Sequence, residues 1–102
     1  MVKDMWLNST IGVIRSFFSK ELPQFIEVKE ISHGPFWEIE FRIEDIRVII
    51  RGDVGFSIYI YIYGSEYELW QYDRSINEKM KTTEDNIIYQ LNILKRALNE
   101  LL

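Results

Sequence analysis

The fold is decided by the stretch from residue 36 to residue 63, which reads FWEIEFRIEDIRVIIRGDVGFSIYIYIY. Its first part, Phe36 to Glu44, alternates between apolar and polar residues from Trp37 onward, which is typical of a strand with one buried face. Trp37, Ile39, Phe41 and Ile43 fall on one face, and Glu38, Glu40, Arg42 and Glu44 on the other. Two more strands are predicted at Ile46 to Arg51 and Phe56 to Tyr63. The segment Arg51 to Gly55 between them contains the glycines that a hairpin connection favours.

A further strand is predicted on each side of this stretch. Before it, Phe25 to Ile31 also has period two, with Ile26 and Val28 on one face and Glu27 and Lys29 on the other, followed by a turn at His33-Gly34-Pro35. After it, Gly64-Ser65 turns the chain into Tyr67 to Tyr72, which we predict as a fifth strand close to the sheet edge. The five segments would form an antiparallel meander.

Helices are predicted at both ends of the chain. From Asp4 to Lys20 the apolar residues recur at helical spacing, and Pro23 ends the helix. The polar segment Ser75 to Thr82 is predicted as a loop or short helical turn, before hydroxyl caps at residues 82–83 start a long C-terminal helix. In that helix, four-three-four-three spacing places one apolar stripe toward the sheet: Ile87, Leu91, Leu94, Leu98 and Leu101. The predicted fold is α+β in two layers, with both helices on one face of a sheet of four to five strands.

The composition indicates one folded, soluble domain spanning residues 1–102. Hydrophobic residues make up 47% of the chain and the net charge is −4, which disfavours both disorder and direct binding to nucleic acid. There is no cysteine, and no segment has the length and composition of a signal peptide or a membrane span. We therefore expect a cytoplasmic protein that does not bind membranes.

Catalytic and metal-binding patterns are weak. His33 is the sole histidine, and no Ser or Cys nucleophile pattern surrounds it. Without cysteines and with one histidine, a transition-metal site is not expected, and no cofactor is predicted. The carboxylates Glu38, Glu40 and Glu44, like Glu66 and Glu68, have the spacing of paired catalytic acids. The same spacing is typical of a solvated strand face on which Arg42, Arg47 and Arg51 pair with the acids, and we favour that interpretation. We expect no enzymatic activity.

The unusual feature is a tyrosine stripe, Tyr59, Tyr61 and Tyr63. Alternation places it on the face opposite Ile58, Ile60 and Ile62, so it meets solvent if the helices cover only one face. Tyr and Trp are enriched where proteins bind proteins. The plainer interpretation is that these tyrosines simply suit a half-exposed strand, with Arg42 or Arg47 stacked over them.

The strand predicted at Tyr67 to Tyr72 could extend this surface through either Tyr67 and Leu69 or Trp70 and Tyr72. Between Asp53 and Asp85 there are seven acidic and three basic residues, so this region carries the net charge. We predict a protein-binding face for a basic partner, since opposite charges steer association. Its residues would be Tyr59, Tyr61, Tyr63 and Trp70, with Glu66, Glu68 and Asp73 at the rim.

A small acidic α+β chain with an exposed aromatic sheet, no catalytic motif and no cofactor motif resembles the immunity proteins of bacterial toxin systems. The resemblance covers the whole chain in size and pattern and includes no diagnostic motif. It implies a cytoplasmic inhibitor that binds and neutralises a cognate toxin, often a basic nuclease.

Three alternatives stay open. One is a small acidic secretion chaperone, against which the absence of a helix between the third and fourth strands argues. Another is a homodimer formed through the aromatic edge strand or stripe. The last is an enzyme or small-ligand domain with a pocket between sheet and helices, for which no polar constellation is present.

Overall fold

The computed structural model describes residues 2–33, 36–52, 56–78 and 83–101. Helix α1 precedes five strands, a short helix α2, a 3-10 helix η1 and helix α3. Their bounds are α1 Val2–Glu21, β1 Ile26–His33, β2 Phe36–Ile43, β3 Ile46–Gly52, β4 Phe56–Ile62, β5 Ser65–Glu68, α2 Leu69–Tyr72, η1 Arg74–Glu78 and α3 Glu84–Leu101.

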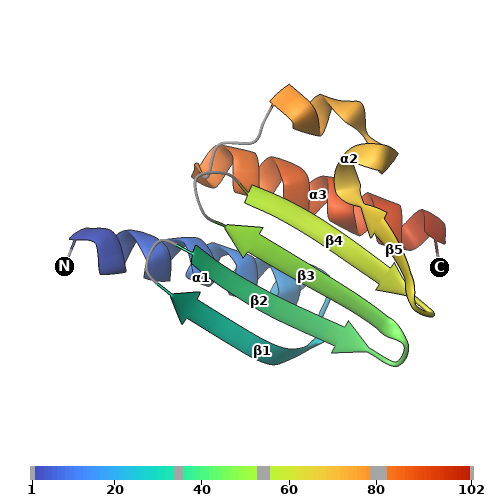
Figure 1. Cartoon of the computed structure of the whole chain (residues 1–102), viewed down its shortest axis with the longest axis horizontal. Helices are drawn as coiled ribbons and strands as arrows, with labels where there is room; N and C mark the ends of the chain where they lie inside the picture. The colour runs from blue at the N-terminus through green and yellow to red at the C-terminus, as the bar shows by residue number, and fades with distance from the viewer. Residues whose placement is uncertain (1, 34–35, 53–55, 79–82, 102) are drawn as a thin grey trace.

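The strands form one antiparallel sheet in the order β1-β2-β3-β4-β5, and α1 and α3 both lie behind it in Figure 1. This is the predicted two-layer α+β fold. Each strand pairs with the next one along the chain, so neighbours in sequence are neighbours in the sheet. The face of the sheet turned away from α1 and α3 is called the outer face below.

The hydrophobic core lies between the sheet and the helices. Eight residues of the predicted apolar strand faces and helix stripe are buried there: Trp37, Ile39, Phe41, Ile58, Ile60, Leu91, Leu94 and Leu98. Helix α1 adds Ile11, Ile14 and Phe18, and the Phe18 ring stacks on Phe41 with 3.7 Å between ring centroids. Helix and strand periodicity therefore identified one common buried layer.

The predicted fifth strand, Tyr67 to Tyr72, is wrong beyond Glu68. β5 ends at Glu68, and α2 begins at Leu69. The side chain of Gln71 accepts a hydrogen bond from the Glu68 amide (3.0 Å), which closes a capping box at the start of the short helix. Leu69 is buried in the core. The chain therefore turns toward the helix layer at this residue and does not continue along the edge of the sheet.

The predicted alternation in the first strand is also wrong. A β-bulge shifts the register between Glu27 and Lys29, so these two residues lie on opposite faces of the sheet. Arg15 of α1 supplies a physical reason. It donates hydrogen bonds to Glu27 at 2.8 and 2.7 Å and also to Glu30, and this holds both acids on the helix side. Val28 falls at the bulge and remains exposed.

Of the predicted loop at Ser75 to Thr82, η1 forms the first part and residues 79–82 lie outside the described residues. The Gly34-Pro35 turn and residues 53–55 lie outside them as well. No helix in the described part of the chain has both the length and the apolar character needed to cross a membrane.

Candidate protein-binding face

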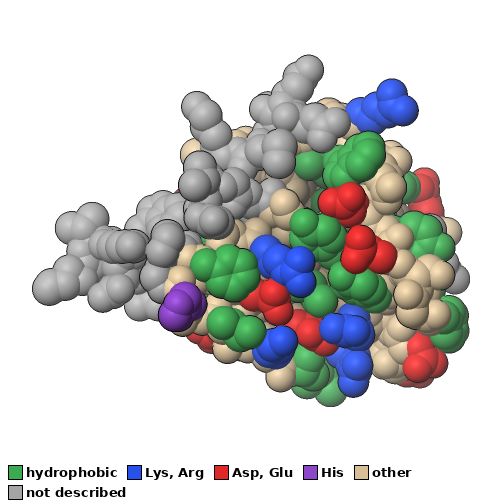
Figure 2. Space-filling view, in the orientation of Figure 1, with side chains coloured by type: hydrophobic (Ala, Val, Ile, Leu, Met, Phe, Trp, Pro, Cys, Tyr) green, Lys and Arg blue, Asp and Glu red, His purple; other side chains and the backbone are tan. Residues whose placement is uncertain are grey.

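The register of the strands determines which side chains share the outer face. One row across the sheet runs Lys29, Glu40, Ile49, Tyr59, Glu68, and the next runs Ile26, Arg42, Arg47, Tyr61, Glu66. Glu38 and Arg51 pair in a third row. Figure 2 shows the result, with hydrophobic, basic and acidic side chains intermixed over the strands.

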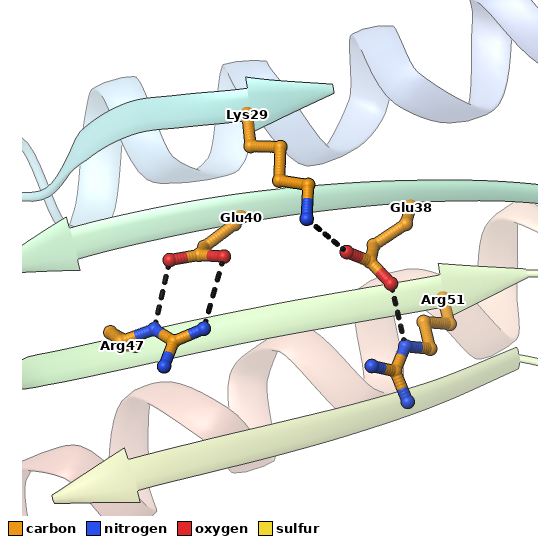
Figure 3. A network of polar contacts seen from close by, with 5 residues as sticks. All are labelled: Lys29, Glu38, Glu40, Arg47 and Arg51. Atoms are coloured by element: carbon orange, nitrogen blue, oxygen red, sulfur yellow. Dashed lines mark hydrogen bonds and ion pairs between the residues drawn. The ribbon is translucent and has the colours of Figure 1, made fainter. Parts of the chain in front are cut away.

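Two of the acids on this face are buried, which overturns their interpretation as part of a solvated surface. Glu38 and Glu40 are each only 6% exposed. Arg47 donates to both oxygens of Glu40, at 2.9 and 3.3 Å, and Arg51 Nε donates to Glu38 Oε1 at 2.7 Å (Figure 3). Lys29 Nζ lies 3.6 Å from Glu38 Oε2. Partly exposed cations thus cover buried carboxylates.

The predicted cross-strand pairing is confirmed for Arg47 and Arg51 but not for Arg42. Within the described residues, no salt bridge of Arg42 is found, and its direct cross-strand neighbour is Arg47. Glu44 lies outside β2, in the turn, with a left-handed backbone (φ 51°).

Ile49 completes the covered part of the outer face. It is 3% exposed, yet it lies between Glu40 and Tyr59 in the register and so points away from the helices. The long side chains of neighbouring arginines can shield an apolar residue in this way because their stems are apolar and their charged ends reach water. The sequence reasoning missed Ile49. Its place between Arg47 and Arg51 in the sequence was the available signal.

The arginines also hold the tyrosines. Arg51 lies over the ring of Tyr59 and Arg47 over the ring of Tyr61, each 5.1 Å from the ring centroid. Tyr61 Oη donates a hydrogen bond to Glu66 on β5 at 2.6 Å. Hydrogen bonding to Glu40 raises the pKa of Arg47, and hydrogen bonding to Glu38 raises that of Arg51, so both guanidiniums stay charged. A continuous chain of contacts runs from Glu40 through Arg47 and Tyr61 to Glu66.

The structure does not bring all the predicted face residues together. Tyr59, Tyr61, Glu66 and Glu68 share the outer face. Tyr63 follows the end of β4 with a left-handed backbone (φ 51°), is 78% exposed, and lines a shallow hollow with Arg42 and Arg47. It therefore borders the outer face at the hairpin ends.

Trp70 and Asp73 lie beyond the end of β5 and belong to no strand of the sheet. Trp70 is on α2, which contacts α3 and β4. Asp73 accepts hydrogen bonds from Ser75, and its other oxygen pairs with Arg96 of α3 at 3.0 Å. The bond from the Ser75 hydroxyl is the main cause that lowers the pKa of Asp73. Asp73 thus links η1 to α3 through these contacts.

The charge of the outer face is balanced, which differs from the expected acidic surface. Four bases (Lys29, Arg42, Arg47, Arg51) accompany four acids (Glu38, Glu40, Glu66, Glu68) in the register. Since Glu38 and Glu40 are neutralised by their partners, the acids in contact with solvent lie along β5, at Glu66 and Glu68. These two residues, called the acidic edge below, both lie on the single strand β5.

His33 ends β1 at an exposed position. Among the described residues, no group of three His, Cys, Asp or Glu side chains converges in a way that could hold a metal ion. Comparison of the chain with protein-family models, with curated proteins and with solved structures finds no match.

The bond between Tyr61 and Glu66 predicts an alkaline titration. This hydrogen bond is the main cause that raises the pKa of Tyr61. The bond therefore contributes fully to stability below the ordinary tyrosine pKa, and this contribution is lost as the pH rises through the pKa of Tyr61 in the folded protein. We expect Glu66→Gln to move one late tyrosinate absorbance step to lower pH. In a Tyr61→Phe background the same substitution should move nothing. A shift that persists in that background would contradict the assignment.

Proposed function

We propose that this chain is a protein-binding domain of the immunity type, which neutralises a cognate toxin domain by holding it against the outer face. The proposal rests mainly on one observation, the arginine-stacked pair Tyr59 and Tyr61. Each ring lies beneath an arginine, and each arginine is tied to a buried carboxylate. The proposal makes the chain a binding protein and not an enzyme.

Immobilised aromatic and arginine side chains are suited to binding for an energetic reason. A side chain that becomes ordered only on association costs about 0.5 to 1.5 kcal/mol of lost freedom. Arg47, Arg51 and the two tyrosines are already ordered by their contacts within the sheet, so a partner would not have to supply that free energy. Tyr and Arg are also among the residues that contribute most to binding when buried at the centre of an interface.

The acidic edge formed by Glu66 and Glu68 lies directly beside the tyrosines. Opposite charges at the rim of an interface mainly accelerate association, whereas desolvated anchors at its centre mainly slow dissociation. This arrangement favours a partner with a basic border around a surface that accepts the tyrosines. A basic toxin domain has that chemistry.

The first experiment is co-expression with the product of the adjacent reading frame, followed by a pull-down and binding kinetics. We expect the two proteins to form a complex. Tyr61→Ala should raise its Kd about thirtyfold, the equivalent of about 2 kcal/mol, because the complex dissociates faster. Tyr72→Ala is the matched control, because Tyr72 is also half-exposed but bonds to Glu100 of α3, in the helix layer. It should leave Kd unchanged.

The second experiment tests steering. We expect Glu66→Lys to slow association and reduce its dependence on salt, while Glu100→Lys, the same charge change on α3, has no such effect.

Two outcomes would contradict the proposal. If Tyr61→Ala and Tyr72→Ala weaken the complex equally, or if neither affects it, the outer face is not the interface. If no complex with the product of the adjacent reading frame is recovered, the proposal that the partner is a cognate toxin is contradicted.

A further inference from the structure

The helix layer has an open groove of about 660 Å³ between α1 and α3. Its middle is apolar, formed by Val13 and Phe17 of α1 and by Ile88 of α3. Ile88 is 40% exposed although it lies next to the buried stripe of α3. The groove is on the opposite layer from the tyrosines, so the proposed function does not account for it.

Gly12 lines the groove on α1. Glycine weakens a helix interior because the unfolded chain loses more freedom there. Within the protein nothing requires this glycine, since a Cβ built at Gly12 meets no atom within 4 Å. A glycine on the open wall of an apolar groove lets the backbone of a second helix approach closely.

The two ends of the groove have opposite charge. Glu21 of α1 pairs with Lys95 in the second half of α3, and Figure 1 shows the two helices running in the same direction. Lys20 therefore lies at one end of the groove and Glu84, the first residue of α3, at the other. Within the described residues neither forms a salt bridge, whereas their neighbours Glu21 and Lys95 pair with each other.

We propose that the groove binds a second copy of this chain, with the two helix layers facing each other across a two-fold axis. An axis that passes through the apolar middle at right angles to the groove reverses its direction, and so places Lys20 of each copy opposite Glu84 of the other. The apolar residues meet at the centre, and Gly12 allows the helices to pack closely. The dimer leaves both outer faces free, on opposite sides of the assembly.

Sedimentation velocity over a range of protein concentrations tests the proposal. We expect a monomer–dimer equilibrium that Ile88→Arg abolishes, because it places a charge at the apolar centre of the interface. Gly12→Leu, whose Cβ meets no atom within 4 Å in the single chain, should preserve the fold by circular dichroism and also abolish the dimer. A protein that is monomeric at every concentration overturns the proposal.

Charge reversal gives a sharper test, because a two-fold interface contains each pair twice. Lys20→Glu and Glu84→Lys should each weaken the dimer by about tenfold or more, since each creates like-charge pairs. The double variant should restore it. Arg74→Glu, on the exposed surface of η1, is the control and should have no effect. A double variant that stays dissociated, or a dimer lost in Tyr61→Ala and kept in Ile88→Arg, overturns the proposal.

Discussion

Replacing Gly52 by Ala is expected to destabilise the protein by about 3 kcal/mol or more, the upper range for overpacking a rigid core. A Cβ at Gly52 would lie 2.1 Å from Trp37 Cε2 and 2.2 Å from Cζ2. Trp37 is directly opposite Gly52 in the β2–β3 register and is fully buried, so its indole could move away from the new Cβ only by displacing other core side chains. Chemical denaturation of the two proteins measures the difference.

Two further variants isolate the cause. Trp37→Leu in the Gly52→Ala background should remove most of the additional loss, because the clash requires the indole. Gly12→Ala, measured in dilute protein, is the matched glycine control, and should stabilise the fold by about 0.5 to 1 kcal/mol because Ala favours a helix. If Gly52→Ala costs the same with and without Trp37, the clash is not its cause.

Leu94→Ala is expected to lower the free energy of unfolding by about 2 to 5 kcal/mol, through lost burial and the cavity left behind. Leu94 is fully buried on α3, in the one core that α3 shares with the sheet and α1. An unchanged denaturation midpoint would mean that the predicted stripe does not face the core.

Ile88→Ala is the control for this prediction, since Ile88 lies on the same helix and loses a side chain of equal size. Because Ile88 is substantially exposed, its truncation should cost about 0.5 kcal/mol or less in dilute protein. Equal losses at the two positions would contradict burial as the cause, and helix propensity could not explain them because Ala is the better helix former at both positions.

Gly52 also illustrates a limit of sequence reasoning. The glycine between Arg51 and Asp53 matches the composition of a hairpin turn, and a turn role follows naturally from the sequence. In the structure it is the last residue of β3, where its missing side chain accommodates a tryptophan from another strand. That requirement comes from the residue opposite, which no local pattern indicates.

The candidate site shows the same division. Alternation placed Tyr59, Tyr61, Glu38 and Glu40 on one face correctly, because side-chain direction along a strand depends only on position in that strand. It could not predict that Glu38 and Glu40 would be buried, since the cations covering them come from β1 and β3. It also placed Trp70 on this face, because it had no means of detecting that burial of Leu69 would end the strand.

By itself the sequence determined the element types of most of the chain, the antiparallel meander and the membership of the core. These depend on periodicity and short turns, which are properties of residues close together in the chain. Only the tertiary structure decided the bulge in β1, the burial of Glu38 and Glu40 in their ion pairs, the stacking of Arg51 on Tyr59, and the groove between α1 and α3. Each of these depends on register or distance between segments far apart in sequence, and packing fixes those only when the whole core forms.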